Sequence, residues 1–247
     1  MESKKNSGKP GLFTSLSPAL LHLYDVSSSI VVIIDVLRAT STIATVLSNG
    51  AKHIIPVETV AECIRLGKQI EGITAGERDG HIAEGLVYGN SPFEYPQKFI
   101  NGKTLVLTTT NGTKLLHIAL ERGAKTIITG SFPNLTAVCD YLIAKKMPVI
   151  LGCAAWKNRV NIEDTLFAGA VISRVKQHFD INCDSSNIAE TLYNDAKEDL
   201  VEFMKAKHAS HYNRLMEHGL ETDIRYCLTP DGANVLCLYE GGKLVKG

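Results

Sequence analysis

The sequence lacks a surplus of charge of either sign, because its 26 Lys and Arg residues are balanced by 26 Asp and Glu residues. A basic surface for nucleic acid is therefore not indicated. No apolar run approaches the length of a membrane span. Residues 1–10 are polar and lysine-rich without an apolar core, so they predict a disordered tail and not a secretory signal. These absences favour a cytoplasmic protein with neither a nucleic-acid nor a membrane partner.

Common metal and nucleotide motifs are missing as well. The 6 cysteines form no CxxC pair, so no structural zinc site is indicated. Several of them lie inside apolar runs, as expected of reduced, buried thiols. Neither common glycine-rich nucleotide motif occurs, so ATP and NAD are not expected as ligands. His208 and His211 would share a helix face, but without an HExxH pattern they do not favour a metal site.

The stretch from residue 30 to residue 42 carries the clearest chemical signal. Its β-branched start, Ile30–Ile34, predicts a strand buried on both faces of a parallel sheet. Asp35 and Arg38 follow at once, and a hydroxyl-rich turn over residues 40–42 leads into a helical spacing. The first amides of a helix have no internal partner and its dipole favours negative charge, so such a turn forms an anion site. We therefore predict that it binds a phosphate-bearing ligand.

A second passage of the chain is similar to the first. Residues 123–128 nearly repeat residues 50–55, and each hexapeptide follows a strand, a threonine-rich turn and a helix. A constant offset places Thr108 opposite Asp35. We interpret this as an internal strand-turn-helix duplication, although the alternative, a helix-to-strand turn common in α/β proteins, stays open. In either case, two such turns at the same end of one sheet would face one ligand-binding crevice.

Strands alternate with helices through the first two thirds of the chain. This alternation predicts an α/β protein, a three-layer α/β/α fold with a largely parallel sheet in a single domain over residues 11–247. Further along we expect one helical region over residues 188–218, and then strands over residues 224–228 and 235–239 that add antiparallel edges. Residues 81–101 contain repeated Gly, Pro and Asn breaks and predict a long loop, which in a compact domain is usually functional.

Five segments carry uncommon motifs in a fixed order. They are residues 32–42, 76–80, 89–95 and 108–113, and Glu163-Asp164 followed by residues 168–170. Together they resemble the 2-phosphosulfolactate phosphatase family over roughly residues 30–170, with a looser match around residues 223–228. The resemblance implies a Mg²⁺-dependent phosphatase that converts 2-phosphosulfolactate to sulfolactate and phosphate, which in methanogens is a step toward coenzyme M.

Such a substrate is small and anionic, and it would need a cation beside the acids of the chain. The candidate acids are too many for anion binding alone, and a divalent cation that bridges acids and phosphate resolves the conflict. The expected metal ligands are Asp35, Glu163 and Asp164. The expected catalytic residues are Asp35, Arg38, Glu77 and Asp79. The expected substrate-binding residues are Arg38, Ala39, Thr40, Ser41, Thr42, Arg78, Asn90, Ser91, Thr110, Asn111, Gly112 and Thr113.

Several roles and functions stay open at this point. Asp35 is either a ligand of Mg²⁺ or the nucleophile, and Glu77 or Asp79 would act as general acid or base. Cys153 is the alternative nucleophile of a cysteine-dependent hydrolase, although the sequence supplies no base for it. A non-catalytic binder of small phosphorylated acids is a third function. A homodimer is the expected assembly, because two-fold oligomers are the commonest.

Overall fold

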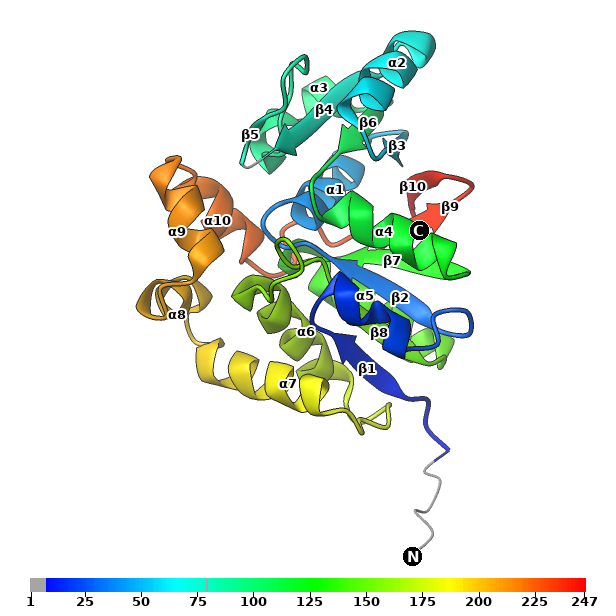
Figure 1. The fold of residues 1–247 in the computed structure, drawn as a ribbon, viewed down its shortest axis with the longest axis vertical. Helices are drawn as coiled ribbons and strands as arrows, with labels where there is room; N and C mark the ends of the chain where they lie inside the picture. The colour runs from blue at the N-terminus through cyan, green and yellow to red at the C-terminus, as the bar shows by residue number, and fades with distance from the viewer. Residues whose placement is uncertain (1–7, 79) are drawn as a thin grey trace, which may run out of the picture.

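The structure is a computed structural model that describes residues 8–78 and 80–247, with helices on both faces of one sheet (Figure 1). The strands are β1 (Leu12–Ser15), β2 (Ile30–Ile34), β3 (His53–Pro56), β4 (Ile73–Arg78), β5 (His81–Ile82), β6 (Thr104–Thr108), β7 (Thr126–Gly130), β8 (Val149–Cys153), β9 (Cys237–Glu240) and β10 (Lys243–Lys246). The helices are α1 (Ala39–Ser48), α2 (Val60–Ile70), α3 (Gln97–Ile100), α4 (Gly112–Glu121), α5 (Leu135–Lys145), α6 (Ile162–Val175), α7 (Asp184–Ala196), α8 (Leu200–Ala206), α9 (Ser210–Glu217) and α10 (Glu221–Cys227). Short 3₁₀ helices cover η1 (Pro18–Leu23), η2 (Pro92–Glu94) and η3 (Phe132–Asn134).

The sheet consists of two parallel halves that run in opposite directions. In the first half β1, β8, β2 and β7 are parallel neighbours, and in the second half β3, β6 and β4 are. The hairpin β9–β10 lies between the halves, antiparallel to β7 on one side and to β3 on the other. The predicted α/β/α fold with a largely parallel sheet and antiparallel strands near the C-terminus is thus confirmed. The prediction that the strand over residues 235–239 forms an edge is wrong, because β9, which overlaps it, lies with β10 between the two halves.

The order of the strands matches the interpretation of a duplication. The duplication would pair a first repeat unit, which contains β2, β3 and β4, with a second repeat unit, which contains β6, β7 and β8. Outward from the hairpin, the first half contains β7, β2 and β8, which are the second, first and third strands of their units, and the second half contains β3, β6 and β4, which are again the second, first and third. In each half the middle strand comes from one repeat unit and its two neighbours come from the other. The helices α1 and α4, which follow the exchanged strands, lie between the two halves (Figure 1).

Strand β2 is buried on both faces, as its uninterrupted apolar run predicts. Ile30, Val32 and Ile34 belong to the same apolar cluster as residues of α5 and α6. Val31 and Ile33 point the other way and pack with residues of α4. Strand β6 is enclosed similarly, by α1 on one face and α2 on the other. These two central strands end at the two turns that carry the predicted site.

The C-terminal third contains a helix where the sequence predicts a strand. Residues 224–228 fall mainly in α10, in which Ile224 and Cys227 are both fully buried. Burial at a spacing of three residues is typical of a helix, and a short apolar run does not distinguish the two structures by itself.

The helical region expected over residues 188–218 is divided into α7, α8 and α9. Asp199 begins α8 by accepting a hydrogen bond from the amide of Glu202 (2.9 Å), and His208 has a left-handed backbone with φ of 49°. These two breaks turn the chain, and they bring α9 against the space between the halves (Figure 1). The loop expected over residues 81–101 holds β5, η2 and α3 within it.

Three other predictions concern the termini, the thiols and membranes. A disordered tail is predicted over residues 1–10, and residues 1–7 of it lie outside the described residues. The Pro10 carbonyl accepts a hydrogen bond from the Asp180 amide (2.9 Å). The cysteines are free thiols, and all but Cys183 are buried. Within the described ranges, no helix combines the length and apolar character needed to cross a membrane.

Candidate active site

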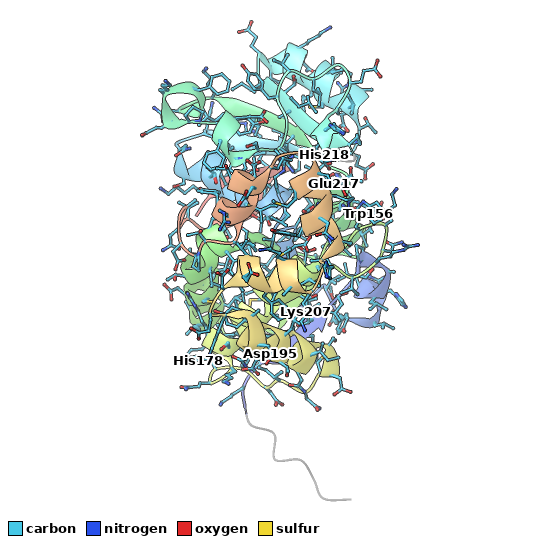
Figure 2. The ribbon with its side chains drawn as sticks, turned by 90° about the vertical axis from the view of Figure 1, so that its left-hand side faces the viewer. Trp156, His178, Asp195, Lys207, Glu217 and His218 are labelled. Carbon is cyan, nitrogen blue, oxygen red and sulfur yellow. The ribbon has the colours of Figure 1, made fainter. Side chains whose placement is uncertain are left out.

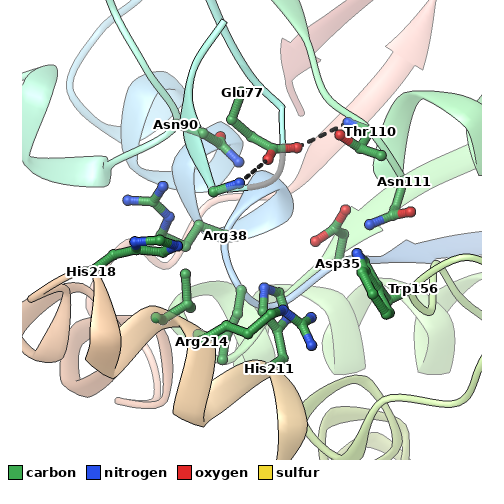
Figure 3. A pocket seen from close by; sticks show the side chains of 13 residues that line it. Asp35, Arg38, Glu77, Asn90, Thr110, Asn111, Trp156, His211, Arg214 and His218 are labelled. Atoms are coloured by element: carbon green, nitrogen blue, oxygen red, sulfur yellow. Dashed lines mark hydrogen bonds between the residues drawn. The ribbon is translucent and has the colours of Figure 1, made fainter.

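A pocket opens where the turn after β2 meets the turn after β6 (Figure 3). Asp35 and Arg38 come from the first turn, and Thr110 and Asn111 come from the second. Helix α9 and the residue after it close the remaining side with further residues. They are His211, Arg214, Leu215 and His218. The pocket therefore combines parts of the chain that are up to 183 residues apart, from Asp35 to His218.

The two turns are in direct contact at Gly112. A Cβ atom at this glycine would lie 3.0 Å from Asp35 Oδ2 and 3.2 Å from the Cβ of Ala39, so a side chain there would force the turns apart. The sequence-based reason for their proximity, a shared end of one parallel sheet, is wrong, because the halves run in opposite directions. The turns meet because α1 and α4 start beside each other and each packs on the other half of the sheet.

Asp35 lines the pocket and is buried. Burial raises the pKa of its carboxyl to about 7, and the neighbouring charges of Glu77 and Glu163 act in the same direction. His211 and the backbone amide of Gly112 oppose the rise. A carboxyl in this setting is poised to bind a proton or a cation near neutral pH.

Glu77 connects two of the walls. One carboxylate oxygen accepts a hydrogen bond from the Thr110 amide (3.0 Å), and the other accepts one from the Gly80 amide (3.1 Å), as the dashed lines in Figure 3 show. Glu77 thus fixes the turn after β4 against the turn after β6. Asp79, the other acid predicted for this segment, lies outside the described residues.

Arg38 is held by an acid that the sequence did not predict. Its Nη1 donates to Asp223 Oδ2 on α10 at 2.5 Å, and both side chains are buried. A guanidinium has five donors, so this ion pair orients the group without using all of them. Arg38 also lines the pocket, on the side of His218 (Figure 3).

The hydroxyls of the first turn are used inside the protein. Thr40 Oγ1 accepts from the Asp35 amide (3.1 Å), and Ser41 Oγ donates to the Val36 carbonyl (2.8 Å). Thr42 Oγ1 donates to the carbonyl of Asn90 (2.8 Å). With Ala39, these residues are buried and frame the turn, and none of them lines the pocket around Asp35.

The acids at the start of α6 have separate partners. Asp164 accepts hydrogen bonds from the amides of Val36 (3.0 Å) and Ala155 (3.1 Å), and so ties the ends of β2 and β8 together. Burial, and then the charges of Glu163 and Asp35, hold the pKa of Asp164 well above its usual range. Glu163, also buried, accepts a hydrogen bond from His211 Nδ1 (2.6 Å).

The remaining predicted binding residues divide into two groups. Asn90 and Thr110 line the pocket, and the Asn90 Oδ1 and Thr110 Oγ1 atoms are buried without a hydrogen-bond partner in the described part of the chain. Asn111 lines it too. The others are engaged elsewhere: Arg78 donates to Thr108 Oγ1 (2.9 Å), Thr113 Oγ1 donates to the Thr109 carbonyl (2.6 Å), and Ser91 lines an adjoining pocket.

Several residues of the site are not predicted from the sequence. Trp156, Arg214 and Asp223 carry no motif that marks them as site residues, and the spacing of His211 suggests only a metal ligand. Figure 2 shows Trp156 beside α9, with His218 at the end of that helix. The one signal available was the loose match around residues 223–228, which contains Asp223.

The environment of Cys153 contradicts a nucleophilic role. The thiol is fully buried, and burial together with the charges of Asp164 and Glu163 raises its pKa well above the usual value. A reactive cysteine needs the opposite surroundings, an accessible site with nearby positive charge. These surroundings contradict a cysteine-dependent hydrolase centred on Cys153.

The metal ligands expected from the sequence do not form a closed cluster. Within residues 8–78 and 80–247, no group of three or more His, Cys, Asp or Glu side chains could hold a metal ion. Mg²⁺ usually needs only one or two protein carboxylates, because water and substrate phosphates complete its shell. Asp35 lines the pocket near the charges of Glu77 and Glu163, so it could serve as such a single carboxylate ligand.

Comparison with known proteins identifies the family to which the chain belongs. The family model described as 2-phosphosulpholactate phosphatase matches residues 15–242. A protein of Thermotoga maritima named "Probable 2-phosphosulfolactate phosphatase" is 45% identical over 201 residues, 81% of this chain and 84% of its own. A protein with the same name from Caldanaerobacter subterraneus is 37% identical over 88% of this chain and 90% of its own. Another from Clostridium acetobutylicum is 35% identical over 89% of this chain and 93% of its own. The chain therefore belongs to the 2-phosphosulfolactate phosphatase family, a family of phosphoric monoester hydrolases.

Proposed function

We propose that this protein hydrolyses the phosphate ester of 2-phosphosulfolactate, or of a closely similar phosphorylated hydroxy acid, in a Mg²⁺-dependent reaction. The observation that carries the proposal is the composition of one pocket, which is lined by the buried Asp35 and by two arginines, Arg38 and Arg214. Such a pocket suits a phosphate ester with additional negative charge. The names of the similar proteins supply the choice of ester.

Asp35 is the residue that we propose would hold Mg²⁺. The negative charges of Glu77 and Glu163 near Asp35 support this assignment, because a cation relieves their mutual repulsion. When bound, Mg²⁺ would withdraw charge from the phosphoryl oxygens. Asp164 is proposed as a structural tie instead, because each of its oxygens already accepts a backbone amide.

His211 is the residue that we propose as the general acid. Glu163 accepts the Nδ1 proton of His211, and this fixes the tautomer and leaves Nε2 to exchange a proton with a ligand. As a water oxygen bonds to phosphorus and the phosphorus–oxygen bond of the ester breaks, the second proton of the imidazolium form, carried on Nε2, would pass to the departing alkoxide. Arg38, oriented by Asp223, would bind the phosphoryl oxygens in the same step.

A phosphate-release assay tests this function. The purified protein would be incubated with 2-phosphosulfolactate and with 2-phospholactate, each with Mg²⁺ and with EDTA. We expect release in Mg²⁺ only, and a loss of at least about 100-fold in Asp35→Asn. Asp195→Asn is the matched control, because Asp195 is exposed on α7, far from His218 (Figure 2).

Each outcome of that assay has a separate meaning. Turnover that persists in EDTA contradicts the role of Mg²⁺ and leaves hydrolysis standing. Tight binding of both compounds without phosphate release would identify a non-catalytic binder, and the proposed function would be wrong.

A further inference from the structure

Arg214 is an arginine whose side chain is fixed before any ligand binds. Its guanidinium carbon lies 4.2 Å from the centre of the Trp156 ring, and its Nη1 donates to the Ser210 carbonyl (3.2 Å). Stacking on tryptophan is a favourable cation–π contact, and it holds the planar group in one orientation. Both residues line the pocket around Asp35 (Figure 3).

The charge of Arg214 has no acidic counterpart in the described part of the chain. No Asp or Glu there lies within ion-pair distance of its guanidinium. Its Nη2 atom is buried and makes no hydrogen bond among the described residues. Leaving a buried charged donor unpaired is costly, so a position of this kind is normally completed by a ligand.

The contrast with Arg38 indicates which anion Arg214 binds. Arg38 sits in the turn next to Asp35, where the phosphate is proposed to bind, and Asp223 already balances its charge. Arg214 approaches from α9, a different wall of the pocket. Arg214 therefore supplies an unbalanced positive charge beside Trp156 that is suited to a second acidic group.

We propose that Arg214, stacked on Trp156, binds one of the two acidic groups, sulfonate or carboxylate, that the substrate carries beside its phosphate ester, and thereby selects esters that carry this group. The inference rests on the proposed function and extends it to specificity. Both a sulfonate and a carboxylate match the planar fork of a guanidinium, so the chemistry is shared and an experiment must separate the two.

Four phosphate esters separate the contributions. They are 2-phosphosulfolactate, 2-phospholactate without the sulfonate, 1-sulfopropan-2-yl phosphate without the carboxylate, and isopropyl phosphate without either. Values of kcat/KM would be measured for the wild type and Arg214→Ala. Arg65→Ala is the matched control, because Arg65 is exposed on α2.

We expect Arg214→Ala to lower kcat/KM for 2-phosphosulfolactate about 10- to 100-fold, mainly through KM, and to change isopropyl phosphate less than about twofold. If the sulfonate is the group bound, 2-phospholactate will be as insensitive as isopropyl phosphate. If the carboxylate is bound, 1-sulfopropan-2-yl phosphate will be the insensitive ester. Arg214→Lys keeps the charge without the fork and should recover part of the loss.

Calorimetric titration with sulfolactate and lactate provides a readout that does not depend on turnover. Arg214→Ala should weaken the binding of sulfolactate about 10-fold or more. It should weaken the binding of lactate by a similar factor only if Arg214 binds the carboxylate, which lactate shares with sulfolactate. A variant with the same ester preference and the same affinity as the wild type would overturn the role of Arg214. Absence of phosphate release by the wild type from all four esters would overturn the proposed function instead.

Discussion

The guanidinium of Arg38 and the carboxylate of Asp223 lie 2.5 Å apart, with only 7% of each side chain exposed. The pair joins the turn after β2 to α10 across 185 residues of sequence. Removing one partner of a buried pair leaves the other charge without compensation, which usually costs more than the pair itself contributes. This ion pair therefore has consequences for both stability and turnover.

Asp223→Ala is expected to lower the free energy of unfolding by about 3 kcal/mol and kcat by at least about tenfold. The reason is that Arg38 loses its orientation and its charge balance. Urea unfolding and phosphate release measure the two effects. The double variant Arg38→Ala/Asp223→Ala should lose less stability than the sum of the single variants, and strict additivity would contradict the coupling.

Asp35→Asn is expected to inactivate the protein and to stabilise it at alkaline pH. The folded-state pKa of about 7 lies above the ordinary 3.8, so between these values the folded protein binds the Asp35 proton more tightly than the unfolded chain does. Wild-type stability should therefore fall as the pH rises from about 4 to about 7, and stay low above that. The cost is at most about 4 kcal/mol.

Thermal unfolding in EDTA at pH 5 and pH 8 measures this effect. Asparagine cannot ionise, so the variant should unfold at a higher temperature than the wild type at pH 8, and the difference should shrink at pH 5. A variant less stable than the wild type at pH 8 would show that Asp35 is not destabilised by burial.

Gly112→Ala is expected to lower kcat about tenfold or more while α4 still forms. The new methyl group would press on Asp35 Oδ2 and on Ala39, and separation of the two turns by a fraction of an ångström is enough to misplace catalytic groups. Steady-state kinetics of phosphate release measure the change in kcat. Gly232→Ala is the matched control, because its Cβ would meet only the Tyr226 ring at 3.7 Å, and an equal loss there would rule out this reason.

His211→Asn and Glu163→Gln are expected to impair alkyl esters more than aryl esters. A general acid contributes about 10²- to 10⁴-fold when the leaving group is a poor one, and little when a phenolate departs without a proton. The ratio of kcat values for isopropyl phosphate and 4-nitrophenyl phosphate measures this dependence. Equal losses on both esters would mean that His211 only shapes the pocket.

The first half of the site could be predicted because its signal is local. An unbroken apolar run marks Ile30–Ile34 as a doubly buried strand, and Asp35 follows in the next position. The roles of Thr40, Ser41 and Thr42 could not be predicted in the same way. A hydroxyl beside a helix start either binds a ligand or bonds its own backbone, and sequence spacing is identical in the two cases.

The second half of the site depends on contacts that leave no local signal. His211 and Arg214 lie on one face of α9, and their spacing would be the same if that face met solvent. Their position follows from the breaks at Asp199 and His208, which looked like parts of one helix. The direction of the second half of the sheet depends similarly on β9 and β10, and the pattern of residues 235–239 predicts only an edge strand.

The exchange of middle strands between the two halves also governs how the chain acquires its structure. A growing polypeptide that has released only β2, β3 and β4 from the ribosome holds strands of both halves and can complete neither, because β7 and β8 must flank β2. Such long-range pairing slows folding. The exchange also means that neither repeat unit forms a complete half of the sheet alone. We therefore expect that the two units do not fold as separate domains.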